Sequence, residues 1–153
     1  MHTFIYALFK LTTYQYIMFK YPAARRLKFN GPFVNIHGDG EFDCGANSYL
    51  SYGTRAFIDK DTYFKIGNNV SVGHNVRVYT SKASTKHLIE TGKKKIFKAN
   101  VAIGNNVLVG ANVYIGPGVT ICDDVVVGAN SVVVKPICES GVYAGIPASK
   151  ISG

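Results

Sequence analysis

The sequence of 153 residues has few cysteines, few acidic residues and no long uninterrupted apolar run. Its cysteines, Cys44, Cys122 and Cys138, form an odd set without a close pair along the chain, which argues against a disulfide framework or a zinc knuckle. Reduced thiols in a cytoplasmic protein are therefore expected. Charged residues make up only 17% of the chain and hydrophobic residues 47%, so the composition is that of a globular protein and excludes a disordered one.

The shortage of acidic residues leaves the chain basic. Lys and Arg number 17 against nine Asp and Glu, and the formal net charge is +8. This imbalance predicts attraction to anions such as phosphorylated cofactors, acidic polysaccharides, membrane headgroups or nucleic acid. No nucleic-acid recognition motif accompanies the charge, so we expect no nucleic-acid partner.

The first twenty residues lack the small-residue cleavage site of a secretory signal, and Lys10 interrupts what would otherwise be a marginal membrane span. At 100° per residue, one side of a helix would collect Phe4, Leu8, Leu11, Met18 and Phe19. An amphipathic helix that ends before Pro22 is therefore predicted. One interpretation is peripheral membrane contact through residues 1–28, supported by the nearby basic side chains of Arg25, Arg26 and Lys28. The favoured interpretation is a helix that caps an open end of the main fold.

What the sequence has in abundance is a six-residue repeat with Gly, Asn or Asp between its aliphatic positions. The aliphatic or aromatic position recurs at Ile66, Val72, Val78, Phe97, Ile103, Val109, Ile115, Ile121, Val127 and Val133. A period of six fits neither a helix nor a simple strand. It fits a coil with three short sides of six residues each, in which side chains 18 positions apart stack about 4.8 Å from one another. The repeat thus predicts an all-β fold, a parallel β-helix or solenoid.

The repeat also divides the chain. Residues 1–28 form the helical segment, and residues 29–153 form the β-helix domain. Residues 33–65 are less regular and predict one or two looser coils. Residues 141–153 leave the period, and we expect them to close the open end of the coil.

A projecting loop is predicted where the period breaks. The step from Val78 to Phe97 is 19 positions instead of six, so 13 residues are added at one corner, at about 80–96. A solenoid holds no buried pocket of its own, so specificity must come from such loops or from grooves between copies. The loop carries five lysines and His87, whose imidazole titrates near neutral pH and is the best candidate for a general base. His74, at a turn of the repeat, is the alternative base.

Two segments near the end of the chain carry a family resemblance. VGANSVVVKPI (127–137) and AGIPASKI (144–151) resemble the hexapeptide-repeat acyltransferases, closest to the maltose, galactoside, nodulation-factor and surface-polysaccharide O-acetyltransferases. The similarity covers about residues 60–151. It implies a left-handed parallel β-helix, a winding that the spacing alone does not give.

The resemblance also implies a site. In that family the molecule is a homotrimer, and acetyl-CoA lies in a groove between adjacent prisms. Position by position, the small residues that line the coenzyme correspond to Gly110, Ala111 and Ala129, and the lysine that meets coenzyme phosphate corresponds to Lys135. The loop histidine that activates the acceptor hydroxyl corresponds to His87, although here it follows Val78 by nine positions.

The expected function is transfer of an acetyl group from acetyl-CoA to a hydroxyl of a sugar or polysaccharide precursor, by a cytoplasmic enzyme without a required metal. One alternative is N-acetylation of an amino sugar. Another is a zinc enzyme similar to the γ-class carbonic anhydrases, which bind zinc through three histidines across a β-helix trimer. Its candidate ligands here are His37, His74 and His87. The sequence leaves the acceptor open.

Overall fold

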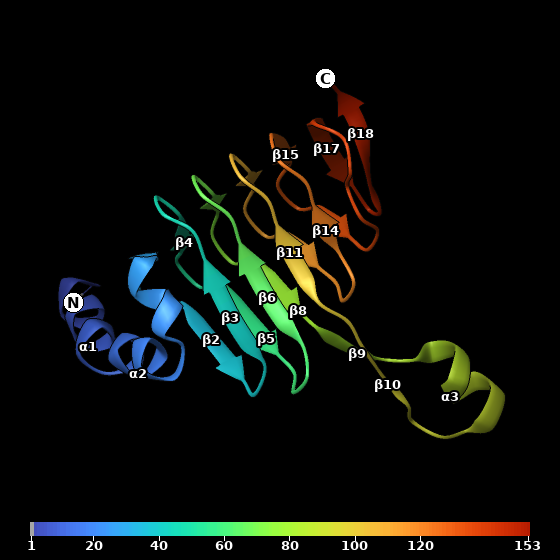
Figure 1. The fold of residues 1–153 in the computed structure, drawn as a ribbon, viewed down its shortest axis with the longest axis horizontal. Helices are drawn as coiled ribbons and strands as arrows, with labels where there is room; N and C mark the ends of the chain where they lie inside the picture. Colours follow the sequence, from blue (N-terminus) through green and yellow to red (C-terminus); the bar gives the residue numbers. More distant parts are fainter. Residues whose placement is uncertain (1) are drawn as a thin grey trace.

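The six-residue repeat winds into a left-handed parallel β-helix, which the computed structural model describes over residues 2–153 (Figure 1). Three parallel sheets form the sides of the prism, named here sheets A, B and C. Sheet A contains β1 (Lys28–Asn30), β4 (Tyr49–Ser51), β7 (Ser71–Val72), β12 (Leu108–Val109), β15 (Val125–Val127), β17 (Gly141–Gly145) and β18 (Ala148–Ser152). Sheet B contains β2 (Asn35–Gly38), β5 (Arg55–Ile58), β8 (Arg77–Tyr79), β13 (Tyr114–Ile115) and β16 (Val132–Val133). Sheet C contains β3 (Glu41–Cys44), β6 (Tyr63–Ile66), β11 (Val101–Ile103) and β14 (Thr120–Ile121).

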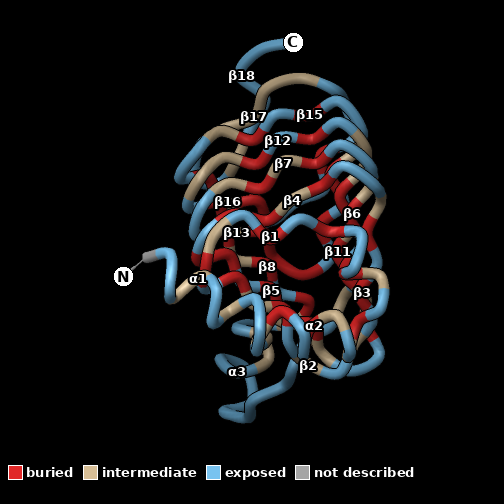
Figure 2. Tube along the Cα trace, turned by 90° about the vertical axis from the view of Figure 1, so that its left-hand side faces the viewer, coloured by how far each residue is buried: buried red, intermediate tan, exposed pale blue. Residues whose placement is uncertain are grey.

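The predicted stacking at a spacing of 18 residues is confirmed in the regular coils. Ile103 pairs with Ile121, and Val109 pairs with Val127, each in parallel register. These side chains point inward, and the inside of the coils is buried while the corners are exposed (Figure 2). Because each side of the prism contributes its aliphatic side chain to the same narrow interior, the repeat itself builds the core.

Phe97 does not belong to this ladder, and the predicted extent of the insertion was too short. Ile103 also pairs with Ile66, and stacked residues on either side of the insertion are 37 positions apart instead of 18, so 19 residues are added. Phe97 lies in the inserted segment with 46% of its surface exposed. Phe97 lies six positions before Ile103 by coincidence. It pairs with Lys82 within the insertion, and this pairing holds it outside the prism.

Polar ladders hold the turns between sheets C and A. Asn69, Asn106 and Asp124 all have positive φ, which Asn and Asp tolerate better than most residues. Their side chains are joined from coil to coil, with 3.1 Å from Asn69 Nδ2 to Asn106 Oδ1 and 3.0 Å from Asn106 Nδ2 to Asp124 Oδ1. The turn residues that break the aliphatic pattern therefore also stabilise the stack.

The N-terminal segment caps the first coil, as two α-helices instead of the single predicted one. These are α1 (His2–Leu11) and α2 (Thr13–Lys20), followed by the 3-10 helix η1 (Pro22–Arg26). Tyr14 and Ile17 are buried against the first coil. No helix in the described part of the chain is long and apolar enough to cross a membrane.

The face of these helices that packs inward is not the one predicted. Phe4, Leu8, Leu11 and Phe19 are exposed, and tyrosines fill the open end instead. The hydroxyl groups of Tyr6 and Tyr21 donate to backbone carbonyls of the first coil, at 2.7 Å and 2.6 Å. The hydroxyl of Tyr14 donates to the carbonyl of Gly31, and burial raises its pKa to about 12. A tyrosine whose hydroxyl has a hydrogen-bond partner can bury its ring as an apolar residue does. The predicted apolar face was wrong because it included only Phe, Leu and Met side chains and no tyrosines.

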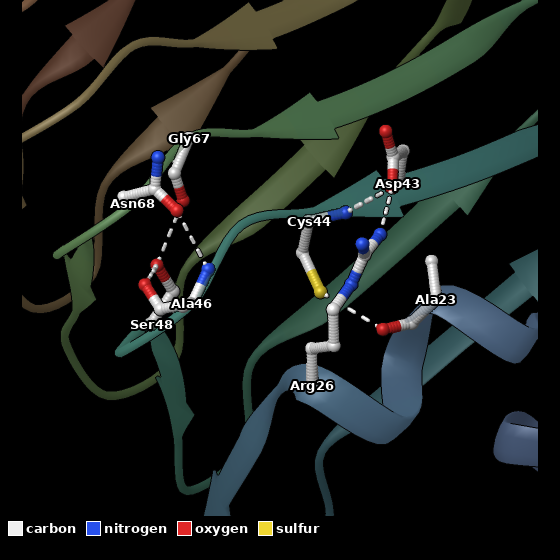
Figure 3. Close-up of polar contacts among 8 residues, drawn as sticks. All are labelled: Ala23, Arg26, Asp43, Cys44, Ala46, Ser48, Gly67 and Asn68. Carbon is white, nitrogen blue, oxygen red and sulfur yellow. Dashed lines mark hydrogen bonds and ion pairs between the residues drawn. The ribbon is translucent and has the colours of Figure 1, made fainter.

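Close contacts join the cap to β3, the last strand of the first coil (Figure 3). The thiol of Cys44 donates to the carbonyl of Ala23 at 3.1 Å, and Arg26 forms an ion pair with Asp43 at 2.5 Å. One turn further on, Asn68 Oδ1 accepts from the amide of Ala46 at 2.8 Å. Cys44 is therefore a buried packing residue of the cap.

The C-terminal segment leaves the repeat, as predicted. After β17 continues sheet A in parallel with β15, β18 turns back and pairs antiparallel with β17. The buried hydroxyl of Ser131 anchors this hairpin, because it donates to the carbonyl of Gly128 at 2.7 Å and accepts from the amide of Gly145 at 3.2 Å. The hairpin covers the end of the prism opposite to the helices (Figure 1).

Candidate functional site

Each corner of the prism carries a different chemistry. The AB corner, where the chain passes from sheet A to sheet B, is lined by small residues. The BC corner, between sheets B and C, carries the insertion. The CA corner holds the ladders of Asn and Asp. Because successive coils stack in register, residues at one corner form a column that runs along the molecule.

The AB corner brings together Gly110, Ala111 and Ala129. Gly110 directly follows β12, Ala129 follows β15 by two positions, and β12 and β15 are parallel neighbours. A side-chain carbon added to Gly110 would lie 2.5 Å from the backbone nitrogen of Ala129, so only glycine fits the backbone approach there. The amide of Asn130 donates to the carbonyl of Ala111 at 2.8 Å, which fixes the spacing of the two turns. The column thus offers a narrow, accessible strip of backbone and methyl groups.

His74 extends the same column toward the helical cap. Its carbonyl accepts from the amide of Asn112 at 2.8 Å, so it lies one coil before Ala111. Its ring is exposed, and the ring of Tyr52 lies beside it with 6.5 Å between centroids. The alternative base is therefore at the AB corner, beside the small residues.

The insertion at the BC corner is an arm with its own secondary structure. We define the arm as β9 (Ser81–Ala83), α3 (Thr85–Thr91) and β10 (Ile96–Lys98), with β9 and β10 paired antiparallel. It projects away from the prism (Figure 1). None of the residues of α3 is buried, which Figure 2 shows as an exposed tip.

The root of the arm is held tightly. Thr80, fully buried, accepts a hydrogen bond from the amide of Asp59 at 2.8 Å, and its hydroxyl lies 2.6 Å from that of Thr62. Lys98 forms an ion pair with Asp59 at 2.8 Å. The hydrogen bond from Lys98 is the main cause that lowers the pKa of the Asp59 carboxyl, and a hydrogen bond from Ser81 lowers it further. The arm therefore leaves and re-enters the prism at one fixed point.

His87 lies in the first turn of α3. Its backbone amide donates to the side chain of Ser84, which begins the helix, and Gly92 ends the helix in a left-handed conformation with φ of 67°. The imidazole borders an open pocket of about 240 Å³ formed by the arm, whose lining includes Glu90, Lys95 and Phe97. A partly exposed imidazole on a projecting tip has room to meet a substrate or a second molecule.

Lys135 lies on the arm's side of the molecule, away from the small-residue column. Val133 of β16 stacks through Ile115 on Val78 of β8, so Lys135, two positions after Val133, is equivalent to Thr80 at the root of the arm. Its position puts the exposed ammonium group at the BC corner, two coils above the root of the arm. The residues of the predicted site therefore divide between two corners of one chain.

The outer face of sheet B joins these two corners and carries residues that the repeat pattern alone does not mark as a site. Tyr79 and Tyr114 stack there with 5.8 Å between ring centroids. Arg77 lies in the same face, and its guanidinium donates to the carbonyl of Gly53 at 2.6 Å. The sequence shows bulky residues, Arg77 and Tyr114, at outward positions of the repeat. Outward positions are not constrained by the core, so the repeat pattern does not predict which of them form a surface site.

The three histidines of the zinc alternative do not meet within one chain. His37 is on β2, His74 at the AB corner and His87 on the arm. Partial burial lowers the pKa of His37, and the positive charges of Arg55 and Lys20 lower it further. In the part of the chain that the structure describes, no three His, Cys, Asp or Glu side chains converge as a metal site would require.

A six-residue repeat wound into a left-handed parallel β-helix is the architecture of the hexapeptide-repeat proteins. Residues 100–135 match the family described as bacterial transferase hexapeptide (six repeats). The structure resembles that of a maltose O-acetyltransferase from Clostridium difficile 630, with 30% identity and a TM-score of 0.67, over 85% of this chain and 71% of that one. The chain belongs to this hexapeptide-repeat family.

Two further relatives agree. The galactoside O-acetyltransferase of Escherichia coli K12 is 34% identical over 111 residues, which cover 65% of this chain and 54% of the relative. The structure of a galactoside acetyltransferase in complex with coenzyme A is 29% identical with a TM-score of 0.63, and the match covers 80% of this chain and 64% of that one. The chain spans about half the length of the curated relatives it matches.

Proposed function

We propose that the protein transfers an acetyl group from acetyl-CoA to a hydroxyl of a saccharide or polysaccharide precursor. The observation that carries this proposal is the pairing of an exposed small-residue column with an arm that bears an accessible histidine, on the two edges of one sheet. The relatives support the acetyl donor, because they are acetyltransferases and one is in complex with coenzyme A, and the maltose and galactoside acetyltransferases among them support a saccharide acceptor.

On the donor side, Gly110, Ala111 and Ala129 take the pantetheine arm of the coenzyme. A linear chain with amide groups needs a narrow strip where backbone donors and acceptors are reachable, and bulky side chains would cover them. Lys135 meets coenzyme phosphate, to which the net charge of +8 also contributes attraction.

On the acceptor side, His87 acts as the general base. Its neutral imidazole takes the proton of the acceptor hydroxyl while the oxygen attacks the thioester carbonyl carbon. The tetrahedral intermediate carries negative charge on the former carbonyl oxygen, which backbone amides stabilise. When the C–S bond breaks, the coenzyme leaves as a thiolate and takes the proton from the imidazolium, so the base is regenerated.

This chemistry requires more than one chain, and we propose a homotrimer. Within one chain His87 and the small-residue column belong to different corners, the arm standing at the BC corner and the column at the AB corner. A neighbouring copy that sets its AB corner against the arm unites both halves. The exposed apolar side chains of the arm, Ile89 and Phe97 among them, supply contact area for that neighbour.

The outer face of sheet B is the proposed binding surface for the acceptor. Stacked Tyr79 and Tyr114 offer flat apolar surface to the hydrogen-rich face of a sugar ring, and Arg77 offers hydrogen-bond donors. The guanidinium of Arg77 beside the two rings favours an acceptor that carries an anionic group.

The test offers the purified protein acetyl-CoA and a panel of maltose-type and galactoside-type saccharides, amino sugars and nucleotide sugars, with the product identified by mass. The expected product is an O-acetyl ester that hydroxylamine removes. His87→Ala should lower kcat by about 10²- to 10⁴-fold with little change in Tm, because no residue of α3 is buried.

His74→Ala is the matched control, since it removes an exposed histidine from the other corner. It should change kcat by only a few-fold. Full activity of His87→Ala together with loss in His74→Ala would move the base to the AB corner. A hydroxylamine-stable amide product on amino sugars alone would replace O-acetylation with N-acetylation, and no transfer to any acceptor would contradict the proposal.

We also propose a cytoplasmic enzyme that touches the membrane surface through residues 1–28. The exposed side chains of Phe4, Leu8 and Leu11 form one face of α1, and the net positive charge favours anionic headgroups. Flotation with vesicles that contain phosphatidylglycerol should recover the protein, and a variant with all three residues changed to Ser should remain unbound. Equal recovery of both would contradict the contact.

A further inference from the structure

The CA corner places Cys122 and Cys138 on successive coils, although their separation of 16 positions does not match the 18 residues of a regular coil. Ile121 and Ile137 form a parallel β-bridge, and the amide of Cys122 donates to the carbonyl of Ile137 at 2.9 Å. Each cysteine is the residue that follows a bridged isoleucine. Equivalent positions on stacked coils lie about 4.8 Å apart, within the range of about 4.4–6.8 Å between the Cα atoms of a disulfide.

The direction of the Cys122 side chain follows from the glycines that precede it in the same column. A side-chain carbon added to Gly67 would point at Gly104 of the next coil, 2.5 Å from its carbonyl oxygen. A carbon added to Gly104 would likewise lie 2.9 Å from the carbonyl carbon of Cys122. Side chains in this column therefore lean toward the following coil. Cys122 carries a real side chain there, and a hydrogen bond joins it to the side chain of Cys138 on the following coil.

The two thiols share one environment. Both border an open groove of about 520 Å³ at the CA corner, together with Thr120, Asp123 and Ser140. Partial burial raises the pKa of the Cys122 thiol, and the charge of Cys138 and a hydrogen bond to it raise the pKa further. Cys138 is exposed and Cys122 half-buried. The outer thiol is thus the one that a reagent reaches first, with the inner thiol directly behind it.

We propose that Cys122 and Cys138 form a dithiol site that small-molecule disulfides oxidise reversibly to a bridge between the last two coils. The Cys138 thiolate attacks one sulfur of the small disulfide and displaces the other as a thiolate, which leaves a mixed disulfide on Cys138. Cys122 then loses its proton to solvent, attacks the Cys138 sulfur and displaces the second small thiolate. The two cysteine thiols are oxidised, and one small disulfide is reduced to two thiols.

The third cysteine is an internal control. Cys44 is buried under the helical cap, burial raises the pKa of its thiol, and its thiol donates to the Ala23 carbonyl. It has neither access nor a partner on the neighbouring coil. The structure therefore separates the three thiols into one reactive pair and one inert residue.

The experiment exposes the folded full-length protein to oxidised glutathione, unfolds it in acid, and counts free thiols by alkylation and mass. The reduced wild type should carry three alkyl groups. The oxidised wild type should carry one, on Cys44, and proteolysis should yield a peptide pair linked through Cys122 and Cys138. Cys44→Ser should form the same bridge. Cys138→Ser should form none.

A thermal measurement adds a readout that does not depend on chemical trapping. The bridge closes a loop in the unfolded chain, so oxidation should raise the Tm of the wild type and of Cys44→Ser by about 5–10 °C. Cys138→Ser should show no rise. Three free thiols after oxidation, a stable glutathione adduct on Cys138 that Cys122 does not displace, or a bridge between chains would each overturn the proposal.

A second probe addresses the reduced protein. Phenylarsine oxide binds firmly only where two thiols are close enough to chelate one arsenic atom. It should stay on the native wild type in an excess of monothiol and wash off Cys138→Ser. Loss of the probe from the wild type under the same conditions would also overturn the proposal, because the two thiols would then be too far apart.

Discussion

The coil stack and the arm use similar residues but place them in opposite surroundings. Ile115 on β13 is fully buried, whereas Ile89 on α3 has 79% of its surface exposed. The stack repeats the same contact from coil to coil, so its stability is spread over many equivalent aliphatic positions. The arm contacts the prism chiefly at its root and leaves its apolar and basic side chains accessible. Stability and recognition are thus assigned to different parts of one short chain.

The largest effect should come from matched truncations of the two isoleucines. Ile115→Ala leaves a cavity in the prism and should lower the free energy of unfolding by about 2–5 kcal/mol. Ile89→Ala removes the same atoms from the surface of the single chain, so at protein concentrations low enough to dissociate the proposed trimer it should change the free energy of unfolding by no more than about 0.5 kcal/mol. Urea unfolding monitored by circular dichroism gives both values. Similar losses in the two variants would show that the arm is packed in the free protein, and the comparison would fail.

A smaller effect should come from the root, where the two regions meet. Thr80→Val keeps the shape of the side chain but leaves the amide of Asp59 without its acceptor, which should destabilise by about 1–3 kcal/mol. Amide hydrogen exchange should accelerate at Asp59 and through β9. Thr85→Val, on the exposed arm, is the control and should leave both quantities unchanged. Slow exchange at Asp59 in Thr80→Val would mean that other contacts hold the root.

The smallest effect concerns the ion pair of Asp59 and Lys98. The pKa of Asp59 lies below its usual value of 3.8 in the folded protein, because Lys98 stabilises the charged carboxylate. The stabilisation is therefore complete above the unfolded value and is lost as the pH falls through the lowered folded value. Tm measured from neutral to strongly acidic pH should be slightly higher for the wild type than for Asp59→Asn at neutral pH. The two should converge in acid, and a gap that widens in acid would contradict the assignment.

The same contrast explains how far the sequence alone could lead. Positions such as Val109 and Val127 are predictable because a prism interior accepts one aliphatic side chain per side, and the spacing repeats. Phe97 matched that spacing and lies outside, since pairing with β9 is a contact that a periodic count does not contain. The inward tyrosines of the cap were missed because their burial depends on carbonyl partners on the first coil.

The candidate site also has a part that could be predicted from the sequence and a part that could not. Gly110, Ala111 and Ala129 come together because register fixes them. The position of His87 relative to them is set by the arm and by whatever the arm contacts, which no spacing encodes. The proximity of Cys122 and Cys138 was also not predicted from the sequence, because the bridge between Ile121 and Ile137 spans 16 positions and not 18. Irregular coils are where a repeat loses its predictive value.

The register of the coils on either side of the arm has an evolutionary consequence. Ile66 and Ile103 stack as though nothing had been inserted between them, so the arm begins and ends at neighbouring points in space. Because the cost of closing a loop grows only slowly with its length, segments of different lengths that start and finish there should be tolerated without refolding the remainder. New specificities are therefore accessible by exchanging a single hairpin, either during gene divergence or by grafting arms between homologues, while the architecture that carries them stays unchanged.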